Sequence, residues 1–301
     1  MDRLIFGDNQ FFGVNHMSEE KARANAMRFQ DMESIFEVLD AALDEGVRTF
    51  MCTTHDRIAH VCDHVRAEPA RYKGYLFYPC MPYAHKYNNA VTEMGMLGAL
   101  KRFLPDGGIL EATIRGGTAV ARKDLDQMVR LLIDAEMRMF DGLATPVIFL
   151  QNVVVDFIMG LGFTEAFRVF ADHVTERYAA EPGFITMNMP RLLDVLEKVG
   201  VDNPIICANI NKIGFRMCGG IHRYETLLAE RTFRPIAMSV LASGAIAPRE
   251  AFEYVCGLPN IQAIVFGAST RGHIRQTREI VERLWLAPGG STNDETASRL
   301  A

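Results

Sequence analysis

Eight short apolar runs, separated by helical patterns, constrain the fold of this chain most strongly. The runs are rich in Val, Ile and Phe and lack polar alternation, which is typical of strands buried on both faces. They lie at Leu4–Phe6, Thr49–Cys52, Leu76–Pro79, Val147–Leu150, Phe184–Met187, Pro204–Ala208, Pro235–Val240 and Ile261–Phe266. Because buried parallel strands need helices on their faces, eight strand–helix units predict an α/β fold, a (β/α)8 TIM barrel.

The segments between these runs carry the spacing of amphipathic helices. Ile35, Leu39 and Leu43 share one face of a helix that we expect to end at Gly46. Similar patterns lie at residues 125–133, 163–174, 192–196 and 273–284. Helices therefore alternate with strands along most of the chain, as a barrel requires.

The length of 301 residues suits one barrel of about 250 residues with additions. We predict a single TIM-barrel domain over residues 1–286. Residues 83–145 exceed what one strand–helix unit needs, so they are predicted to form an insertion in the loop after the third strand, although the apolar run 108–114 could instead supply a strand. The tail, residues 287–301, contains Pro288-Gly289-Gly290-Ser291 and is predicted to be disordered.

Composition excludes several classes of function. The formal net charge of −5 argues against a nucleic-acid partner, which would need a basic surface. No apolar run is long enough to span a membrane, and the N-terminus lacks the layout of a signal peptide. The six cysteines show no CxxC pair, so reduced thiols are expected. We expect a soluble cytoplasmic protein with a small-molecule substrate, and homo-oligomerisation is left open.

Polar side chains follow several of the predicted strands, where barrel enzymes carry their chemistry. Amide and imidazole groups suit a ligand with many donors and acceptors, such as a nicotinamide, a sugar or a sugar phosphate. Equally, a single amide at such a position can simply satisfy loop backbone. The candidate substrate-binding residues are Asp8, Asn9, His16, His85 and Gln151.

The last strand leads into Gly267-Ala268-Ser269-Thr270-Arg271 and then a helix. A buried strand, a glycine and a helix N-terminus together form a favourable anion site. Arg271 and Arg275, one helical turn apart, could hold a phosphate there. The alternative is an ordinary basic face, which the nearby Glu279 and Glu282 favour.

The order of the C-terminal segments resembles the aldo-keto reductase superfamily. The matching pieces are Met187-Asn188, Ala208-Asn209, Ser239 to Gly244, and Gly267 to Arg271 with Arg275. The resemblance implies a nicotinamide dinucleotide, NADPH in preference to NADH if the arginines hold its adenosine phosphate. The cofactor-binding residues implied are Asn188, Asn209, Ser239, Gly267, Ser269, Thr270, Arg271 and Arg275.

The catalytic tetrad of that family, an Asp, a Tyr, a Lys and a His, is absent in its usual form. Met51 stands where the Asp falls, Cys80 near the Lys, and Gln151 or Leu150 near the His, while His55 or Asp56 occupies the Tyr position. His55 and Asp56 are therefore the best acid–base candidates, although a surface His with its Asp capping the next helix is an equal alternative.

Tyr83 with Lys86 could replace the missing tetrad from the third loop. Three interpretations then remain. The first is NAD(P)H-dependent reduction or oxidation of a small polar carbonyl or sugar-type compound. The second is a phosphosugar lyase, isomerase or epimerase that uses His55, Asp56 and His85 with or without a divalent metal. Candidate ligands for such a metal are Asp8, His16, His55 and His85. The third is a catalytically silent ligand-binding barrel.

Overall fold

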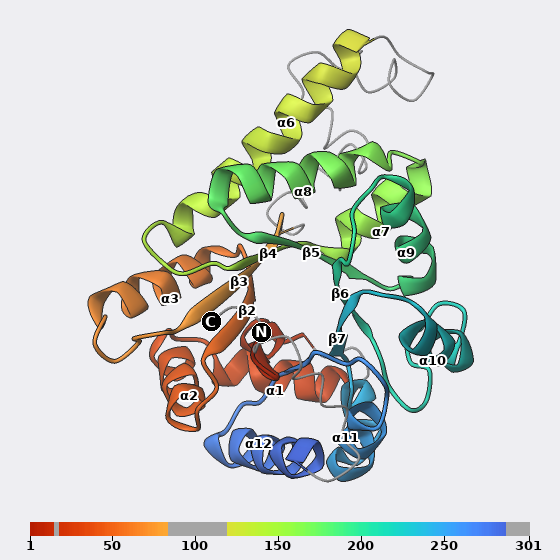
Figure 1. Ribbon diagram of the computed structural model, residues 1–301. Coiled ribbons are helices and arrows are strands. Elements are labelled where there is room, and N and C mark those ends of the chain that lie inside the picture. Colours follow the sequence, from red (N-terminus) through yellow and green to blue (C-terminus); the bar gives the residue numbers. More distant parts are fainter. Residues whose placement is uncertain (15–17, 84–118, 287–301) are drawn as a thin grey trace, which may run out of the picture. The chain divides into compact units, whose positions relative to one another are not determined.

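The computed structural model describes residues 1–14, 18–83 and 119–286. Eight parallel strands form a closed barrel in the order β1 to β8 (Figure 1). They are β1 (Leu4–Gly7), β2 (Thr49–Thr53), β3 (Leu76–Met81), β4 (Val147–Leu150), β5 (Glu181–Thr186), β6 (Ile205–Asn209), β7 (Arg234–Met238) and β8 (Ala263–Phe266). The predicted (β/α)8 barrel is confirmed, and each predicted strand overlaps an observed one.

The chain divides into two compact units. The first holds residues 1–51, 187–190 and those from 205 onward, and in it β1 pairs with β8, β8 with β7 and β7 with β6. Helices α11 and α12 lie side by side, and α12 also contacts α2. Its helices are α1 (Glu19–Arg28), α2 (Glu33–Asp44), α10 (Ile221–Glu230), α11 (Pro248–Cys256) and α12 (Arg271–Leu286).

The second unit holds residues 52–186 and 191–204. In it β4 pairs with both β3 and β5, and α7 and α8 pack against β5. Figure 1 shows α6 running beside α8, in agreement with the contacts between them. Its helices are α3 (Asp56–Ala67), α6 (Ala119–Met137), α7 (Asn152–Leu161), α8 (Glu165–Tyr178) and most of α9 (Met189–Lys198).

Two strand boundaries differ from the prediction for reasons that the structure makes clear. Strand β5 begins at Glu181 rather than Phe184, because Gly183 pairs with Phe149 and leaves room for that ring. A Cβ atom at position 183 would lie 2.4 Å from Cε1 of Phe149. Strand β7 ends at Met238 rather than Val240, because Ser239 has a φ of 55°, which breaks an extended strand.

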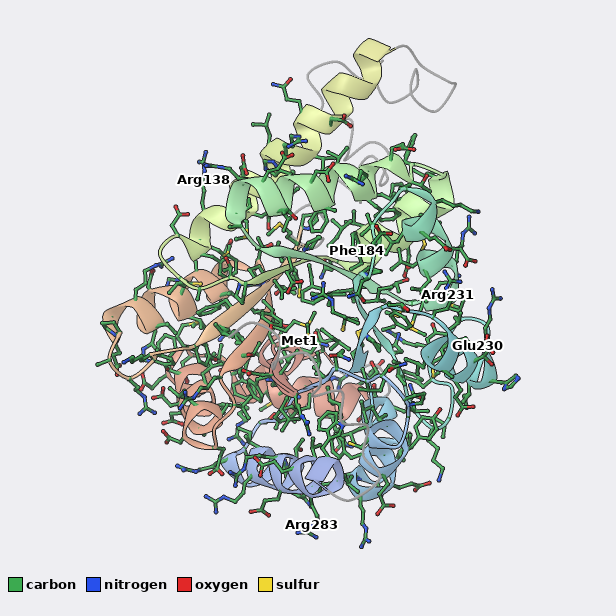
Figure 2. All side chains as sticks on the ribbon, in the orientation of Figure 1. Met1, Arg138, Phe184, Glu230, Arg231 and Arg283 are labelled. Carbon is green, nitrogen blue, oxygen red and sulfur yellow. The ribbon has the colours of Figure 1, made fainter. Side chains whose placement is uncertain are left out.

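Parts of the prediction fall outside the described residues. The apolar run 108–114 and the tail 287–301 belong to these parts, as do His16, His85 and Lys86. Within the described ranges, the segment 83–145 contains α6 and the short helix η3 (Arg138–Phe140). No helix in these ranges has the length and apolar character to cross a membrane. Figure 2 shows the described side chains on the ribbon, in the orientation of Figure 1.

Candidate functional site

In the second unit, a buried threonine joins the ends of β2 and β3. Thr54, fully buried, donates a hydrogen bond from Oγ1 to Oε2 of Glu136, a residue of α6 that is only 4% exposed. The backbone N–H of Tyr83 donates to the same Thr54 oxygen at 3.2 Å. Because one hydroxyl both donates and accepts, it fixes Tyr83, in the loop after β3, to the end of β2.

His55 caps helix α3 from the end of β2. Its Nδ1 accepts a hydrogen bond from the backbone N–H of Arg57 at 3.0 Å, and its ring meets that of Tyr83 edge to face with centroids 5.1 Å apart. Because Nδ1 acts as an acceptor, the proton of a neutral His55 is assigned to Nε2. Neutral His55 can therefore donate a hydrogen bond from Nε2.

The other candidates of this unit have different surroundings. Asp56 is exposed in the first turn of α3, and the capping role proposed for it belongs to His55. Gln151, half-buried, precedes α7 and donates its backbone N–H to the Met81 carbonyl at 2.8 Å. The structure thus brings His55 and Tyr83 together.

Two positions where the family resemblance places tetrad members hold buried side chains. Met51 and Cys80 are both 5% exposed and lie within β2 and β3. The Cys80 thiol donates to the carbonyl of Tyr78 at 3.6 Å. These two strand positions therefore serve packing.

In the first unit, Gly267 after β8 lies against Gln10 after β1. A Cβ at Gly267 would stand 2.4 Å from Oε1 of Gln10. Gln10 is 6% exposed, its Nε2 donates to the Gly7 carbonyl at 2.7 Å, and its Oε1 has no hydrogen-bond partner. The predicted substrate residues Asp8 and Asn9 adjoin it, Asp8 buried and Asn9 exposed.

The turn after β7 has an unusual backbone. Ser239, Ala242 and Ser243 have φ values of 55°, 46° and 59°, and Gly244 has 93°. Left-handed conformations at non-glycine residues are sparsely populated and gather at ligand sites. Ser239, predicted to bind a cofactor, opens this turn, so its position is set by a strained backbone.

Helix α1 reaches both this turn and the segment after β8. The Lys21 ammonium lies 3.1 Å from the place where a Cβ of Gly244 would be, and Ser269 donates to Oδ1 of Asn25 at 3.1 Å. Lys21 has no carboxylate partner among the described residues. Helix α1 buries none of its residues, so it lies on the surface of the unit.

The predicted cofactor residues of β5 and β6 are partly engaged within the protein. Asn209 is 1% exposed, and its Nδ2 donates to the Arg216 carbonyl at 3.1 Å and to the Met187 sulfur at 2.8 Å. Asn188 is half-buried at the start of the following segment. Thr270 accepts a hydrogen bond from the His273 backbone at 3.2 Å, which caps α12.

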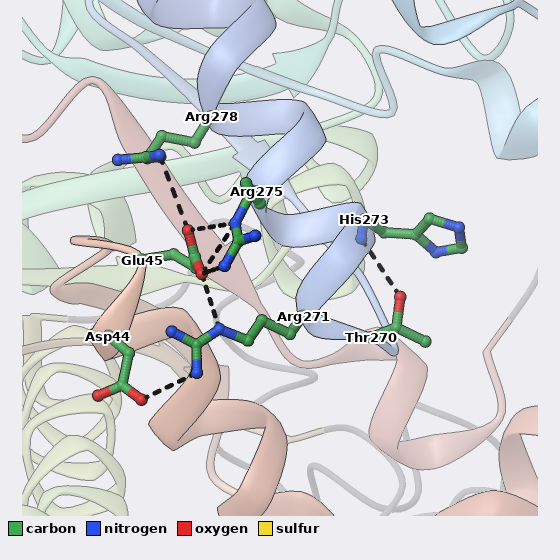
Figure 3. Close-up of polar contacts among 7 residues, drawn as sticks. All are labelled: Asp44, Glu45, Thr270, Arg271, His273, Arg275 and Arg278. Carbon is green, nitrogen blue, oxygen red and sulfur yellow. Dashed lines mark hydrogen bonds and ion pairs between the residues drawn. The ribbon is translucent and has the colours of Figure 1, made fainter.

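The two arginines predicted to bind phosphate both contact Glu45 (Figure 3). Arg271 Nε donates to Oε1 of Glu45 at 2.7 Å and Arg275 Nη2 to the same oxygen at 2.8 Å. Arg271 also reaches Asp44 at 3.4 Å, and Arg278 lies 3.7 Å from the Glu45 carboxylate. Hydrogen bonds from Arg275 and then Arg271 lower the pKa of Glu45 from 4.5 to about 2.

The sequence analysis did not predict three features of the candidate site: Glu45, helix α1 and Glu136. Glu45 lies 226 residues from Arg271, and α1 has no buried face, so neither gives a local signal. Glu136 does give one, because it continues the apolar face of Leu132 and Ile133 at helical spacing. A carboxylate on an apolar face points to a buried polar contact.

No group of three or more His, Cys, Asp or Glu side chains suited to a metal ion occurs within residues 1–14, 18–83 and 119–286. The predicted metal set includes His16 and His85, which lie outside these ranges. The residues assigned to substrate, cofactor and catalysis remain predictions.

Comparison with known proteins supports the fold. No family model and no curated protein matches the sequence. Among solved structures, a Pseudomonas aeruginosa protein assigned to the aldo-keto reductases matches with a TM-score of 0.58 and 11% identity, over 94% of this chain and 90% of that one. Aldose reductase from Giardia lamblia matches with a TM-score of 0.52 and 11% identity, over 93% and 87%.

A third structure, a thermostable aldo-keto reductase crystallised with the inhibitor epalrestat, matches with a TM-score of 0.52 and 13% identity, over 94% of this chain and 90% of that one. The chain therefore has the fold of the aldo-keto reductases. At such identities the likeness concerns the fold, and the chemistry must be argued from the residues of this chain.

Proposed function

We propose that this protein is a nicotinamide-dinucleotide-dependent oxidoreductase that acts on a small polar carbonyl compound of the sugar type. The observation that carries the proposal is the pair of segments that α1 joins in the first unit, the turn at residues 239–244 and the stretch Gly267–Thr270. They are the segments in which the sequence resembles the dinucleotide-binding part of the aldo-keto reductases.

The residues of these segments fit a diphosphate. Gly267 is exposed and carries no side chain, so its backbone can approach a ligand. Lys21 supplies a cation without a carboxylate partner among the described residues, and the hydroxyl of Ser269 and the amide of Asn25 add polar groups. A lysine ammonium and small polar side chains together bind phosphate oxygens well.

NADPH is the proposed form of the dinucleotide. Arg271, Arg275 and Arg278 lie around two carboxylates, Asp44 and Glu45, and Glu279 also acts on Arg275. A 2′-phosphate would compete with these carboxylates for the guanidinium groups. To bind it, Arg271 would exchange part of its contact with Asp44, which at 3.4 Å is the longer of its two ion pairs.

The dinucleotide supplies or accepts a hydride when bound, and the protein must handle the proton. His55 is the proposed proton donor: it gives up the Nε2 proton as the imidazolium, which forms when Nδ1 takes up a proton and releases its contact with the Arg57 N–H. Tyr83 packs against its ring, and Thr54 fixes the Tyr83 backbone. Asp8, Asn9 and Gln151 are proposed to bind polar groups of the substrate, with Asp56 a further acid–base candidate.

The test begins with binding. Titration of the protein with NADPH and NADH, followed by nicotinamide fluorescence, should show saturable binding that favours NADPH. Lys21→Ala should weaken it about tenfold, the effect of one charge-assisted hydrogen bond. Arg23→Ala is the matched control, because Arg23 lies on the same helix, is 80% exposed and pairs only with Glu19. Absence of binding to either nucleotide would refute the proposal.

The second test measures catalytic turnover of carbonyl compounds. With a panel of sugar aldehydes and small ketones, His55→Ala should lower kcat by roughly 10²-fold or more, the usual contribution of a general acid. His60→Ala is the control, since His60 is exposed on α3. Dinucleotide binding without turnover of any carbonyl compound would favour a silent ligand-binding barrel instead.

A further inference from the structure

A buried histidine of α8 joins two side chains of α6, the helix beside it in Figure 1. His173 is 7% exposed, its Nδ1 lies 3.1 Å from Nη1 of Arg130, and its Nε2 lies 2.8 Å from Oδ1 of Asp134. Because a guanidinium group only donates, Nδ1 accepts, and the proton of the neutral ring is assigned to Nε2, which donates to Asp134. Arg130 and Asp134 are one turn apart, so the ring holds one face of α6 against α8.

Tyr178, the last residue of α8, adds a second hydrogen bond to Asp134. Its hydroxyl donates to the same Oδ1 at 2.6 Å, and its ring meets that of His173 edge to face with centroids 6.0 Å apart. Desolvation and the bond to Asp134 raise the pKa of Tyr178, so its hydroxyl remains a donor. The Asp134 cluster, which we define as Arg130, Asp134, His173 and Tyr178, therefore ties α6 to α8 by three hydrogen bonds.

Such a cluster fixes one register of the two helices. An apolar contact between helices tolerates small shifts, whereas a buried hydrogen-bond network is satisfied in one arrangement and is costly when partly broken. If α6 slid along α8, the shared carboxylate oxygen of Asp134 would lose both of its donors. The position of α6 along its own axis is therefore set by the Asp134 cluster.

The other side of α6 carries Glu136 to the candidate site. Asp134 and Glu136 are two residues apart, about 200° around the helix, so they point to different sides. Glu136 is 4% exposed and accepts the hydrogen bond of Thr54, whose oxygen in turn accepts the backbone N–H of Tyr83 at 3.2 Å. Tyr83 packs against the ring of His55. A continuous series of contacts therefore runs from α8 through α6 to His55.

We propose that His173 and Tyr178 are positioning residues for the candidate site. Through the Asp134 cluster they set the register of α6, which brings Glu136 to Thr54 at the end of β2. The loop after β3 is thereby held in place. The effect on this loop can be measured without any substrate, whereas the effect on turnover rests on the proposed function.

The backbone N–H of Tyr83 reports on this arrangement directly. Its hydrogen exchange, followed by NMR on the intact chain, measures how often its bond to Thr54 opens. Tyr178→Phe removes one donor to Asp134. This substitution should speed the exchange about tenfold, the effect of losing one hydrogen bond to a charged group.

Tyr254→Phe is the matched control for Tyr178→Phe. Tyr254 donates to Glu225 at 2.9 Å and so joins α11 to α10 in the first unit. Its substitution removes a bond of the same chemistry and should lower Tm by a similar amount, yet leave the exchange of the Tyr83 amide unchanged. An effect that came only from lower global stability would appear equally in both variants.

A pair of substitutions tests His173. His173→Ala removes both hydrogen bonds of the ring and should speed the exchange of the Tyr83 amide. His173→Gln keeps one donor and one acceptor and should restore most of the protection. If His173→Ala fails to fold, Tyr178→Phe still decides the question. Exchange of the Tyr83 amide at the same rate in Tyr178→Phe as in Tyr254→Phe would overturn the proposal.

Turnover separates this inference from the proposed function. With a carbonyl compound that the protein reduces, Tyr178→Phe should lower kcat and leave the Kd of the dinucleotide unchanged, while Tyr254→Phe alters neither. An unchanged kcat would overturn the role in catalysis. If no carbonyl compound is turned over, the proposed function fails, and the exchange of the Tyr83 amide still decides whether the Asp134 cluster positions the loop.

Discussion

The substitution Gly267→Ala tests how the ends of β1 and β8 pack together. The new Cβ would lie 2.4 Å from Oε1 of Gln10 and 3.3 Å from its Cδ, whereas ordinary contacts are about 3.5–4.0 Å. The φ of Gly267 lies outside the left-handed range, so alanine strains no backbone there. The effect must come from the collision with Gln10.

The Gln10 side chain can avoid the new Cβ of residue 267 only by moving out of its present position. It is 6% exposed and anchored by its 2.7 Å hydrogen bond to the Gly7 carbonyl. Loss of that bond costs about 1 kcal/mol, and crowding in a packed site costs about 1–3 kcal/mol. The reduced freedom of the unfolded chain returns about 0.4–1 kcal/mol. We expect a net loss of about 1–3.5 kcal/mol of unfolding free energy from these opposing effects.

A double-mutant cycle isolates the free-energy cost of the clash between the new Cβ of residue 267 and the Gln10 side chain. In a Gln10→Ala background the obstacle is gone, so Gly267→Ala should stabilise the protein by about 0.5 kcal/mol. The coupling between the two sites should therefore be about 1.5–4 kcal/mol. Urea unfolding of the four proteins, checked by thermal scans, measures each value. If Gly267→Ala costs the same free energy in both backgrounds, the reasoning is refuted.

Further predictions concern Glu45 and the barrel strands. Because the pKa of Glu45 is lowered from 4.5 to about 2, its stabilising effect is complete above pH 4.5 and is lost as the pH falls toward 2. Thermal scans over this range should show a steeper loss of Tm for the wild type than for Glu45→Gln, and parallel curves would contradict the assignment. Gly183→Ala places a Cβ 2.4–2.9 Å from three ring atoms of Phe149 and should cost about 1–3 kcal/mol in urea unfolding. Phe149→Leu should partly relieve that cost, and no relief would show that the ring is not the cause.

The strands could be predicted from sequence because their signal is local. Each buried strand is a short run of Val, Ile and Phe, and burial on both faces removes the polar alternation that would otherwise obscure it. Helix α1 was not predicted, because it buries no residue and therefore lacks an apolar face. Apolar periodicity in the sequence therefore predicts the barrel, but it does not predict the surface helix α1.

The positions of the candidate site residues were predictable, but their partners were not. Parallel strands put the residues after them at one end of a barrel, so His55 and Ser239 stand at such ends as expected. What each side chain contacts depends on segments distant in sequence. Arg271 illustrates this, because its Glu45 partner is 226 residues away and no local pattern indicates it.

If this chain transfers a proton, the group that does so lies outside the two buried strand positions that the family resemblance assigns to the tetrad. Met51 and Cys80 are buried in the strands, so no proton donor can be recovered there without rebuilding the core. The loop after β2 instead presents His55, whose Nδ1 is occupied by helix α3 and whose ring packs against Tyr83. A helix-capping histidine has a fixed orientation and tautomer, so its neutral ring presents an Nε2–H hydrogen-bond donor to a developing alkoxide, and it transfers a proton only as the imidazolium, once Nδ1 has released the Arg57 N–H. If the protein reduces carbonyl compounds, the reaction depends on a histidine of a loop rather than on a tyrosine–lysine pair.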